Sequence, residues 1–135
     1  MNGTLCNTVD LRELDLIVIA SLMNVERVHG IKNPFKGHLA FEIQKKVEES
    51  VHSMAEREIQ IDDQLVFSLL PFMKPEKIEI EDEGGLKIYV NGDAAVVLKY
   101  YREEIETVMC YSKINDTDEF INNIKDEIRG ENFGE

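Results

Sequence analysis

The first stretch of the chain has the apolar period of a helix. Apolar residues recur at spacings of three and four, at Leu11, Leu14, Val18, Leu22 and Val25. This period predicts a helix that begins near Leu11, where Asp10 and Glu13 have the spacing of a capping box. The β-branched run at residues 16–19 is also typical of a central strand, and the period leaves that alternative open.

Two more helices are predicted before the pattern changes. The first covers residues 38–57, and its inward stripe consists of Leu39, Ile43, Val47, Val51 and Met54. Asp62 or Asp63 is placed to cap the second. That helix ends at Pro71 and Pro75, because proline interrupts the hydrogen bonds of a helix.

After the third helix the period changes to the alternation of strands. The expected strands are residues 78–81, 86–90, 94–101 and 104–111. Asn91 and Gly92 predict a tight hairpin turn of type I′ between the second and the third strand. Asp116 and Glu119 then have capping-box spacing for a last helix, which Gly130 ends.

Together these elements predict a single α+β domain over residues 1–135. It consists of N-terminal helices, a four-stranded antiparallel β-meander and a C-terminal helix. The two ends, residues 1–9 and 130–135, are expected to be loose.

The composition fits such a domain and restricts its partners. The 135 residues are 43% hydrophobic and 31% charged, and the net charge is -12. A strongly negative chain repels phosphate groups, so neither nucleic acid nor an anionic membrane is expected as a partner. Residues 103–135 carry 10 acidic residues against 3 basic ones, which indicates either a solubilising end or a surface that attracts a basic partner.

The cysteines and the N-terminal region indicate the cellular compartment of the protein. Cys6 and Cys110 do not make a disulfide framework. No basic segment of a signal peptide precedes the apolar run at residues 16–23, and that run is too short to span a bilayer. These features predict a cytoplasmic protein.

No set of residues has the spacing of a catalytic or metal site. His29, His38 and His52 lack metal-ligand spacing, and His52 with its neighbouring glutamates is interpreted as a surface charge cluster. Residues 115–119 resemble a calcium loop but lack its glycine and its distal glutamate, so helix capping explains them better. The sequence therefore predicts no enzyme, no cofactor and no metal.

The predicted sheet carries apolar or aromatic side chains on both faces. One interpretation is that helices cover one face and the remaining aromatic residues are scattered. The other is a tyrosine-bearing surface that binds a protein, with Tyr89 and Tyr101 opposite the core residues Ile88 and Leu98. The partner-binding residues predicted on this basis are Tyr89, Tyr101, Val97, Lys87 and Lys99.

Several short segments carry a family resemblance. They are DLREL at 10–14, NVE at 24–26, GI at 30–31, SMAEREI at 53–59 and KPE at 74–76. In their order, and in the hydrophobic spacing over residues 8–128, the chain resembles the EspG-type chaperones of type VII secretion and their shorter relatives in Gram-positive bacteria. The mycobacterial chaperones consist of two similar halves, whereas this chain supplies one, so the resemblance allows a homodimer.

The resemblance implies a non-enzymatic cytoplasmic chaperone or adaptor that holds a secreted helical substrate before export. The negative charge equally suits a second class, an acidic immunity protein that neutralises a basic toxin. Both functions predict that the partner is another protein.

Overall fold

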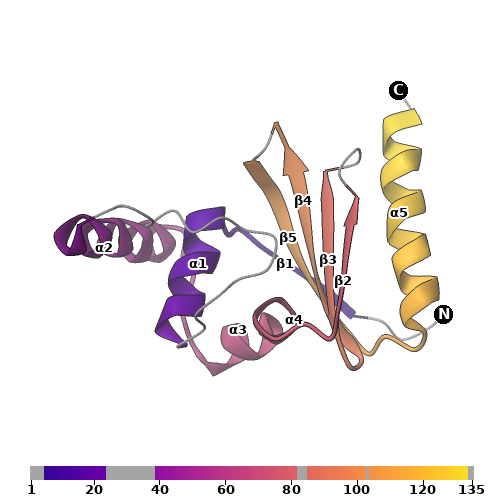
Figure 1. Ribbon diagram of the computed structural model, residues 1–135, viewed down its shortest axis with the longest axis horizontal. Coiled ribbons are helices and arrows are strands. Elements are labelled where there is room, and N and C mark those ends of the chain that lie inside the picture. Colours follow the sequence, from indigo (N-terminus) through magenta and orange to yellow (C-terminus); the bar gives the residue numbers. More distant parts are fainter. Residues whose placement is uncertain (1–4, 24–38, 82–84, 103, 134–135) are drawn as a thin grey trace.

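The computed structural model describes residues 5–23, 39–81, 85–102 and 104–133, which form an α+β fold as the sequence predicts. The strands are β1 (Leu5–Val9), β2 (Lys77–Glu81), β3 (Leu86–Asn91), β4 (Ala94–Tyr101) and β5 (Glu104–Ser112). They make one antiparallel sheet in the order β1-β5-β4-β3-β2 (Figure 1).

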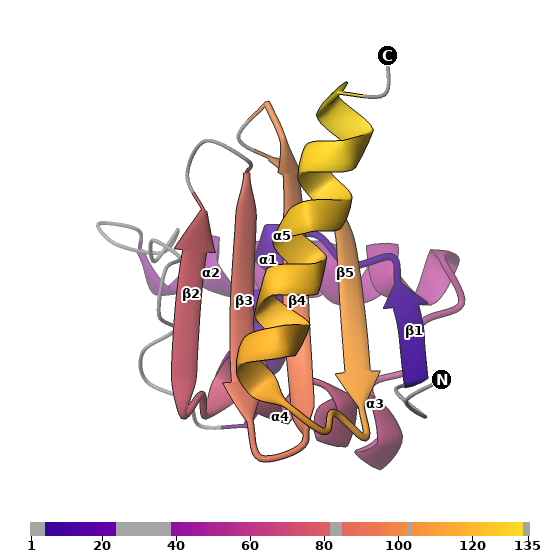
Figure 2. The same cartoon turned by 90° about the vertical axis from the view of Figure 1, so that its right-hand side faces the viewer.

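Helices lie on both faces of this sheet. They are α1 (Glu13–Leu22), α2 (Ala40–Glu56), α3 (Asp63–Ser68), α4 (Leu70–Met73) and α5 (Thr117–Phe133). The four N-terminal helices lie on one side, and α5 lies on the other (Figure 1). Figure 2 shows α5 crossing its face of the sheet diagonally. The fold therefore has three layers, with the sheet in the middle.

The sheet has one strand more than predicted, because residues 5–9 are β1 and not a loose end. β1 pairs with β5 over its whole length, from Leu5 opposite Ser112 to Val9 opposite Val108. Its partner is about a hundred positions away in the sequence, and local pattern does not reveal such a pairing. The four predicted strands are all present.

Each face of the sheet has its own hydrophobic core. The core under the N-terminal helices is built from Leu11, Leu16, Val18, Ile19, Met54, Leu69, Phe72, Met73, Tyr89, Val96, Leu98, Val108 and Cys110. The core under α5 is built from Leu86, Ile88, Val90, Ala95, Val97, Ile114, Phe120, Ile121 and Ile124. Alternation along β3 and β4 sends successive side chains to opposite cores.

The apolar run at residues 16–19 is helical, which settles the alternative that its β-branched residues leave open. All four of its residues are buried in α1, as expected for a helix that is apolar nearly all round. The predicted capping box of Asp10 and Glu13 is wrong. The Asp15 carboxylate takes that role by accepting the backbone N–H of Arg12 at 2.9 Å.

The other predicted helix ends are partly confirmed. Asp62 caps α3 by accepting the Leu65 N–H at 2.9 Å, and Asp116 accepts the Glu119 N–H at 3.1 Å at the start of α5. The predicted third helix is two short helices, α3 and α4, which are interrupted at Leu69. Gly130 does not end α5, which runs on to Phe133.

The hairpin between β3 and β4 is displaced by one residue from the prediction. Asn91 pairs with Ala94, so the two loop residues are Gly92 and Asp93. Of these two only Gly92 has a positive φ, at +60°. That is the pattern of a type II′ turn, and the predicted type I′ turn, which needs positive φ at both loop residues, is wrong.

The helix α2 is less buried than its apolar stripe predicts. Of the five stripe residues only Met54 is buried, Ile43 and Val47 are half-buried, and Leu39 and Val51 are exposed. α2 packs on α1 and projects away from the sheet (Figure 1). The stripe therefore packs mainly on α1, and of its residues only Met54 and Val47 reach the core under the N-terminal helices.

Candidate protein-interaction surface

The residue predicted as the main anchor, Tyr89, lies in the core under the N-terminal helices. Its side chain is 0% exposed, and its ring meets the Phe72 ring edge-on at a centroid distance of 5.1 Å. Burial, together with the charge of Glu13, raises the pKa of Tyr89 to about 12. A side chain in this position stabilises the fold, so its assignment to a binding surface is wrong.

The other four predicted residues do not share a surface. Val97 is fully buried under α5. The side chain of Lys87 is half-buried, and its Nζ lies 4.6 Å from the centre of the Tyr100 ring. Lys99 is half-buried, and Tyr101 is 60% exposed beside the Arg102 guanidinium. Among the predicted residues only Tyr101 is open to a partner.

The register of the hairpin explains this separation. Tyr89 lies opposite Val96, and Ile88 lies opposite Val97. With a two-residue loop, each odd-numbered residue of β3 pairs with an even-numbered residue of β4, and paired residues lie on the same face of the sheet. Tyr89 therefore shares its face with Val96 and not with Tyr101. The prediction paired two odd-numbered tyrosines, which lie on opposite faces.

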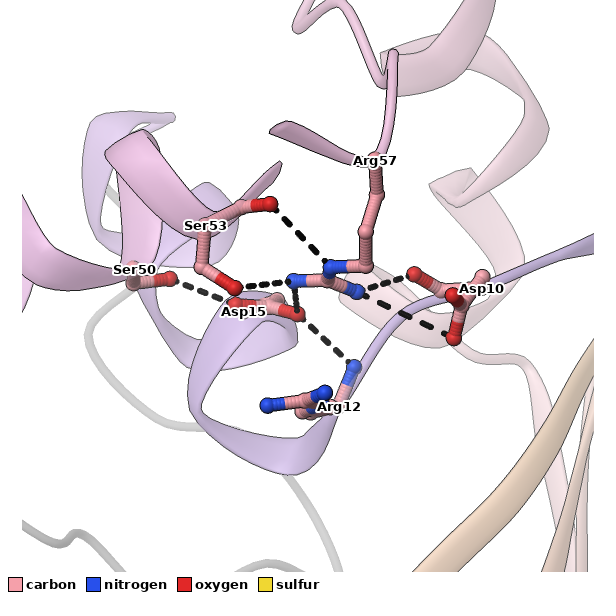
Figure 3. A network of polar contacts seen from close by, with 6 residues as sticks. All are labelled: Asp10, Arg12, Asp15, Ser50, Ser53 and Arg57. Carbon is pink, nitrogen blue, oxygen red and sulfur yellow. Dashed lines mark hydrogen bonds and ion pairs between the residues drawn. The ribbon is translucent and has the colours of Figure 1, made fainter. Parts of the chain in front are cut away.

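A network of polar groups lies between α1 and the end of α2 (Figure 3). At its centre the Asp15 carboxylate is buried and forms an ion pair with Arg57, with an Nη2–Oδ2 distance of 2.6 Å. The Ser50 hydroxyl donates to Asp15 Oδ1 at 2.6 Å. Sequence reasoning missed this site, although Asp15, an acidic residue directly before the apolar run at residues 16–19, was a signal for it.

Arg57 connects this network to the strand β1. Its guanidinium also donates to the backbone carbonyl of Ser53, to the Ser53 hydroxyl and to the backbone carbonyl of Asp10, which follows β1 (Figure 3). The buried Asp15 carboxylate accepts three hydrogen bonds, from Arg12, Ser50 and Arg57, and its charge is paired, so its polar contacts lie within the fold. The arrangement therefore acts as a structural joint between β1, α1 and α2.

Large apolar side chains are exposed at several positions in the N-terminal helical layer. Phe41 of α2 is 68% exposed, and Phe67 of α3 is 75% exposed. Large apolar side chains of this layer are exposed at Leu22, Met23, Leu39, Phe41, Val51, Phe67 and Leu70. Over its described side chains α5 has none. Large exposed apolar side chains are candidates for contact with another protein where several of them adjoin.

The outward face of α5 is polar and acidic. Its exposed side chains include Glu119, Asp126 and Glu127, with Asn122 and Asn123 between them. The helix also forms ion pairs with the edge strand β2, between Asp118 and Lys77 and between Lys125 and Glu79. The acidic end that the composition indicates is therefore, in part, one face of an ordered helix.

The candidate metal-ligating residues do not cluster in the described part of the chain. No group of three or more metal-ligating side chains occurs among them. The Nε2 atom of His52 lies 3.0 Å from Glu56 Oε1, and both side chains are exposed, as predicted for a surface charge cluster. His29 and His38 lie outside the described residues. No helix in the described part of the chain has the length and apolar character needed to cross a membrane.

Comparison of the chain with protein-family models, with curated proteins and with solved structures finds no match. The EspG-type resemblance stays a prediction. Two of the segments that carry it, at residues 24–26 and 30–31, lie outside the described residues.

Proposed function

We propose that this protein is a non-enzymatic cytoplasmic adaptor or chaperone that binds a secreted helical protein. The observation that carries the proposal is the set of exposed apolar side chains on the N-terminal helices, above all Phe41 and Phe67. Helical partners bind through apolar side chains at helical spacing, and an exposed phenylalanine on a helix offers a matching contact. The EspG-type resemblance supports the same class of partner.

The position of α2 also supports a binding role. Arg57 and Ser50 fix its C-terminal half to α1, while its first residues project with Leu39 and Phe41 exposed. A helix that is already folded and held at one end loses little conformational entropy when a partner packs against it. The predicted sheet surface is not part of this proposal, because Tyr89 and Val97 are buried.

The test is a calorimetric titration of the full chain with helical proteins encoded by the genes next to its own. Phe41→Ser or Phe67→Ser is expected to weaken binding at least about fivefold, since a buried aromatic anchor contributes more than about 1 kcal/mol. Gln44→Ser and Gln64→Ser are the matched controls, because both are exposed on the same two helices. If both phenylalanine variants bind like the wild type, the proposed surface is wrong.

The acidic outward face of α5 favours a second candidate function, an immunity protein that neutralises a basic toxin. Charge reversal at Glu119, Asp126 and Glu127 should then slow association steeply, and added salt should have the same effect. In the adaptor proposal the same triple variant binds its helical partner as the wild type does. Association rates measured at two salt concentrations distinguish the two functions.

A further inference from the structure

The two edges of the sheet differ in charge. β2 ends the sheet on one side, where Lys77 and Glu79 form ion pairs with α5. β1 ends it on the other side, and its residues are Leu5, Cys6, Asn7, Thr8 and Val9, without a charge among them. Edge strands commonly carry charges that prevent pairing with another strand. β2 has this protection, and β1 lacks it.

β1 is also uncovered on both of its faces. Leu5 is 54% exposed, and Cys6, Asn7 and Thr8 are exposed although they point alternately to opposite sides of the sheet. Within the described residues no strand pairs with the outer side of β1, which forms the edge of the sheet in Figure 2. Its outward backbone donors and acceptors can be satisfied by another extended strand.

The strand is held in place before any partner arrives. All five residues pair with β5, and the Leu11 N–H donates to the Val9 carbonyl at 3.0 Å. Just beyond its end the Asp10 carbonyl accepts a hydrogen bond from Arg57. A preorganised strand loses little entropy on binding, so the new backbone hydrogen bonds contribute more of their energy to association.

We propose that two copies of this chain pair antiparallel through β1 and so join their sheets into one. A two-fold axis at Asn7 sets Leu5 of one copy opposite Val9 of the other, and Cys6 opposite Thr8. The exposed Leu5 side chain then gains an apolar neighbour, and every contact occurs twice. This proposal goes beyond the adaptor function and does not depend on it.

Symmetry favours a second copy as the partner, and the absence of charge at β1 permits one. The chain has a net charge of -12, so two copies repel each other across most of their surfaces. At β1 no acidic side chain faces its counterpart, whereas antiparallel pairing of two β2 edges would bring their glutamates together. A copy also matches the edge by symmetry in length and in sequence, and a different strand would have to match it independently.

The first test is sedimentation of the full chain from low to high micromolar concentration. The wild type is expected to form a dimer as its concentration rises, and Asn7→Lys is expected to raise the dimer Kd about tenfold, because it sets two like charges opposite each other. Ile80→Lys adds the same charge to the β2 edge and should leave the dimer unchanged. Urea midpoints equal to that of the wild type will show that both variants are folded.

Mixing and cross-linking test the register itself. An equimolar mixture of Asn7→Lys and Asn7→Asp chains should dimerise more strongly than either chain alone. Oxidised Thr8→Cys should yield covalent dimers, because its new thiol faces Cys6 of the other copy, and Cys6→Ser in that variant should abolish them. A wild type that stays monomeric throughout, or a dimer that Ile80→Lys weakens and Asn7→Lys does not, overturns the proposal.

Discussion

The two faces of the sheet are closed in different ways. On one face a single long helix, α5, buries Phe120, Ile121 and Ile124 against the strands. On the other face α1, α3 and α4 together cover the sheet, and α2 packs mainly on α1, with its Met54 in the same core. The outward residues of α5 are polar, whereas the N-terminal helices keep large apolar side chains exposed.

This difference follows from how each layer meets the sheet. α5 is amphipathic along its length, so its apolar side packs on the sheet and its polar side faces the solvent. α1 is apolar nearly all round and is covered by the sheet on one side and α2 on the other. Because α1 already fills much of the space over the sheet, some apolar side chains of α2 and α3 find no place in the core and stay exposed. The two faces thus differ in their outer surfaces, which are polar on α5 and partly apolar on the N-terminal helices.

The largest expected effect concerns the tyrosine that the sequence assigned to the surface. Tyr89→Ala should lower the free energy of unfolding by about 3–5 kcal/mol, because it leaves a cavity beside Phe72 in the core under the N-terminal helices. Tyr101→Ala, at an exposed position, should change it by less than about 0.5 kcal/mol. Urea unfolding measures both variants. Equal effects would show that the two tyrosines do not differ in burial.

The next effect concerns the joint that attaches α2. Arg57→Met should cost about 2–3 kcal/mol, because it leaves the buried Asp15 carboxylate without its cation while the hydroxyl of Ser50 still donates to it. Adding Asp15→Asn to this variant should restore part of the loss, since the orphaned charge is then removed.

Urea unfolding of the single and double variants measures this recovery. A double variant that is less stable than Arg57→Met would show that the cost does not come from the unpaired charge. Lys45→Met, at an exposed position on the same helix, is the control for removing a surface cation.

Local sequence pattern was sufficient for most of the elements. Alternation predicted β2 to β5, and the carboxylates of Asp62 and Asp116 cap helices where their spacing indicated. These features depend on residues that are close in sequence. β1 and the contact between Asp15 and Arg57 depend on residues far apart, and for that reason the pattern missed both.

The candidate surface was harder to predict than the fold. Alternation tells which residues share a face of one strand, but the pairing of two strands depends on the turn between them. Moreover, helices cover both faces of the middle of this sheet, so Tyr89 on one face and Val97 on the other are both core residues. The exposed Phe41 and Phe67 lie on helices. A helical period predicts which side chains share a face of the helix, but it does not predict how deeply neighbouring elements bury that face.

The smallest expected effect concerns the ion pair that ties α5 to β2. Lys77 Nζ lies 2.9 Å from Asp118 Oδ1, and both side chains are largely exposed. The hydrogen bond from Lys77, reinforced by its charge, lowers the pKa of Asp118 from its ordinary value of 3.8. A carboxyl whose pKa is lower in the folded state stabilises the fold above its unfolded pKa, and this contribution disappears as the pH falls through the folded pKa.

Acidification from pH 7 to below 3.8 should therefore reduce the urea midpoint of the wild type slightly more than that of Asp118→Asn. Concentrated salt at pH 7 should narrow the gap between the two proteins, because an exposed pair is screened. Asp126→Asn is the matched control, since Asp126 is exposed on the same helix without an ion pair among the described residues. A wild type and an Asp118→Asn variant with the same pH dependence would mean that the ion pair between Lys77 and Asp118 does not stabilise the fold.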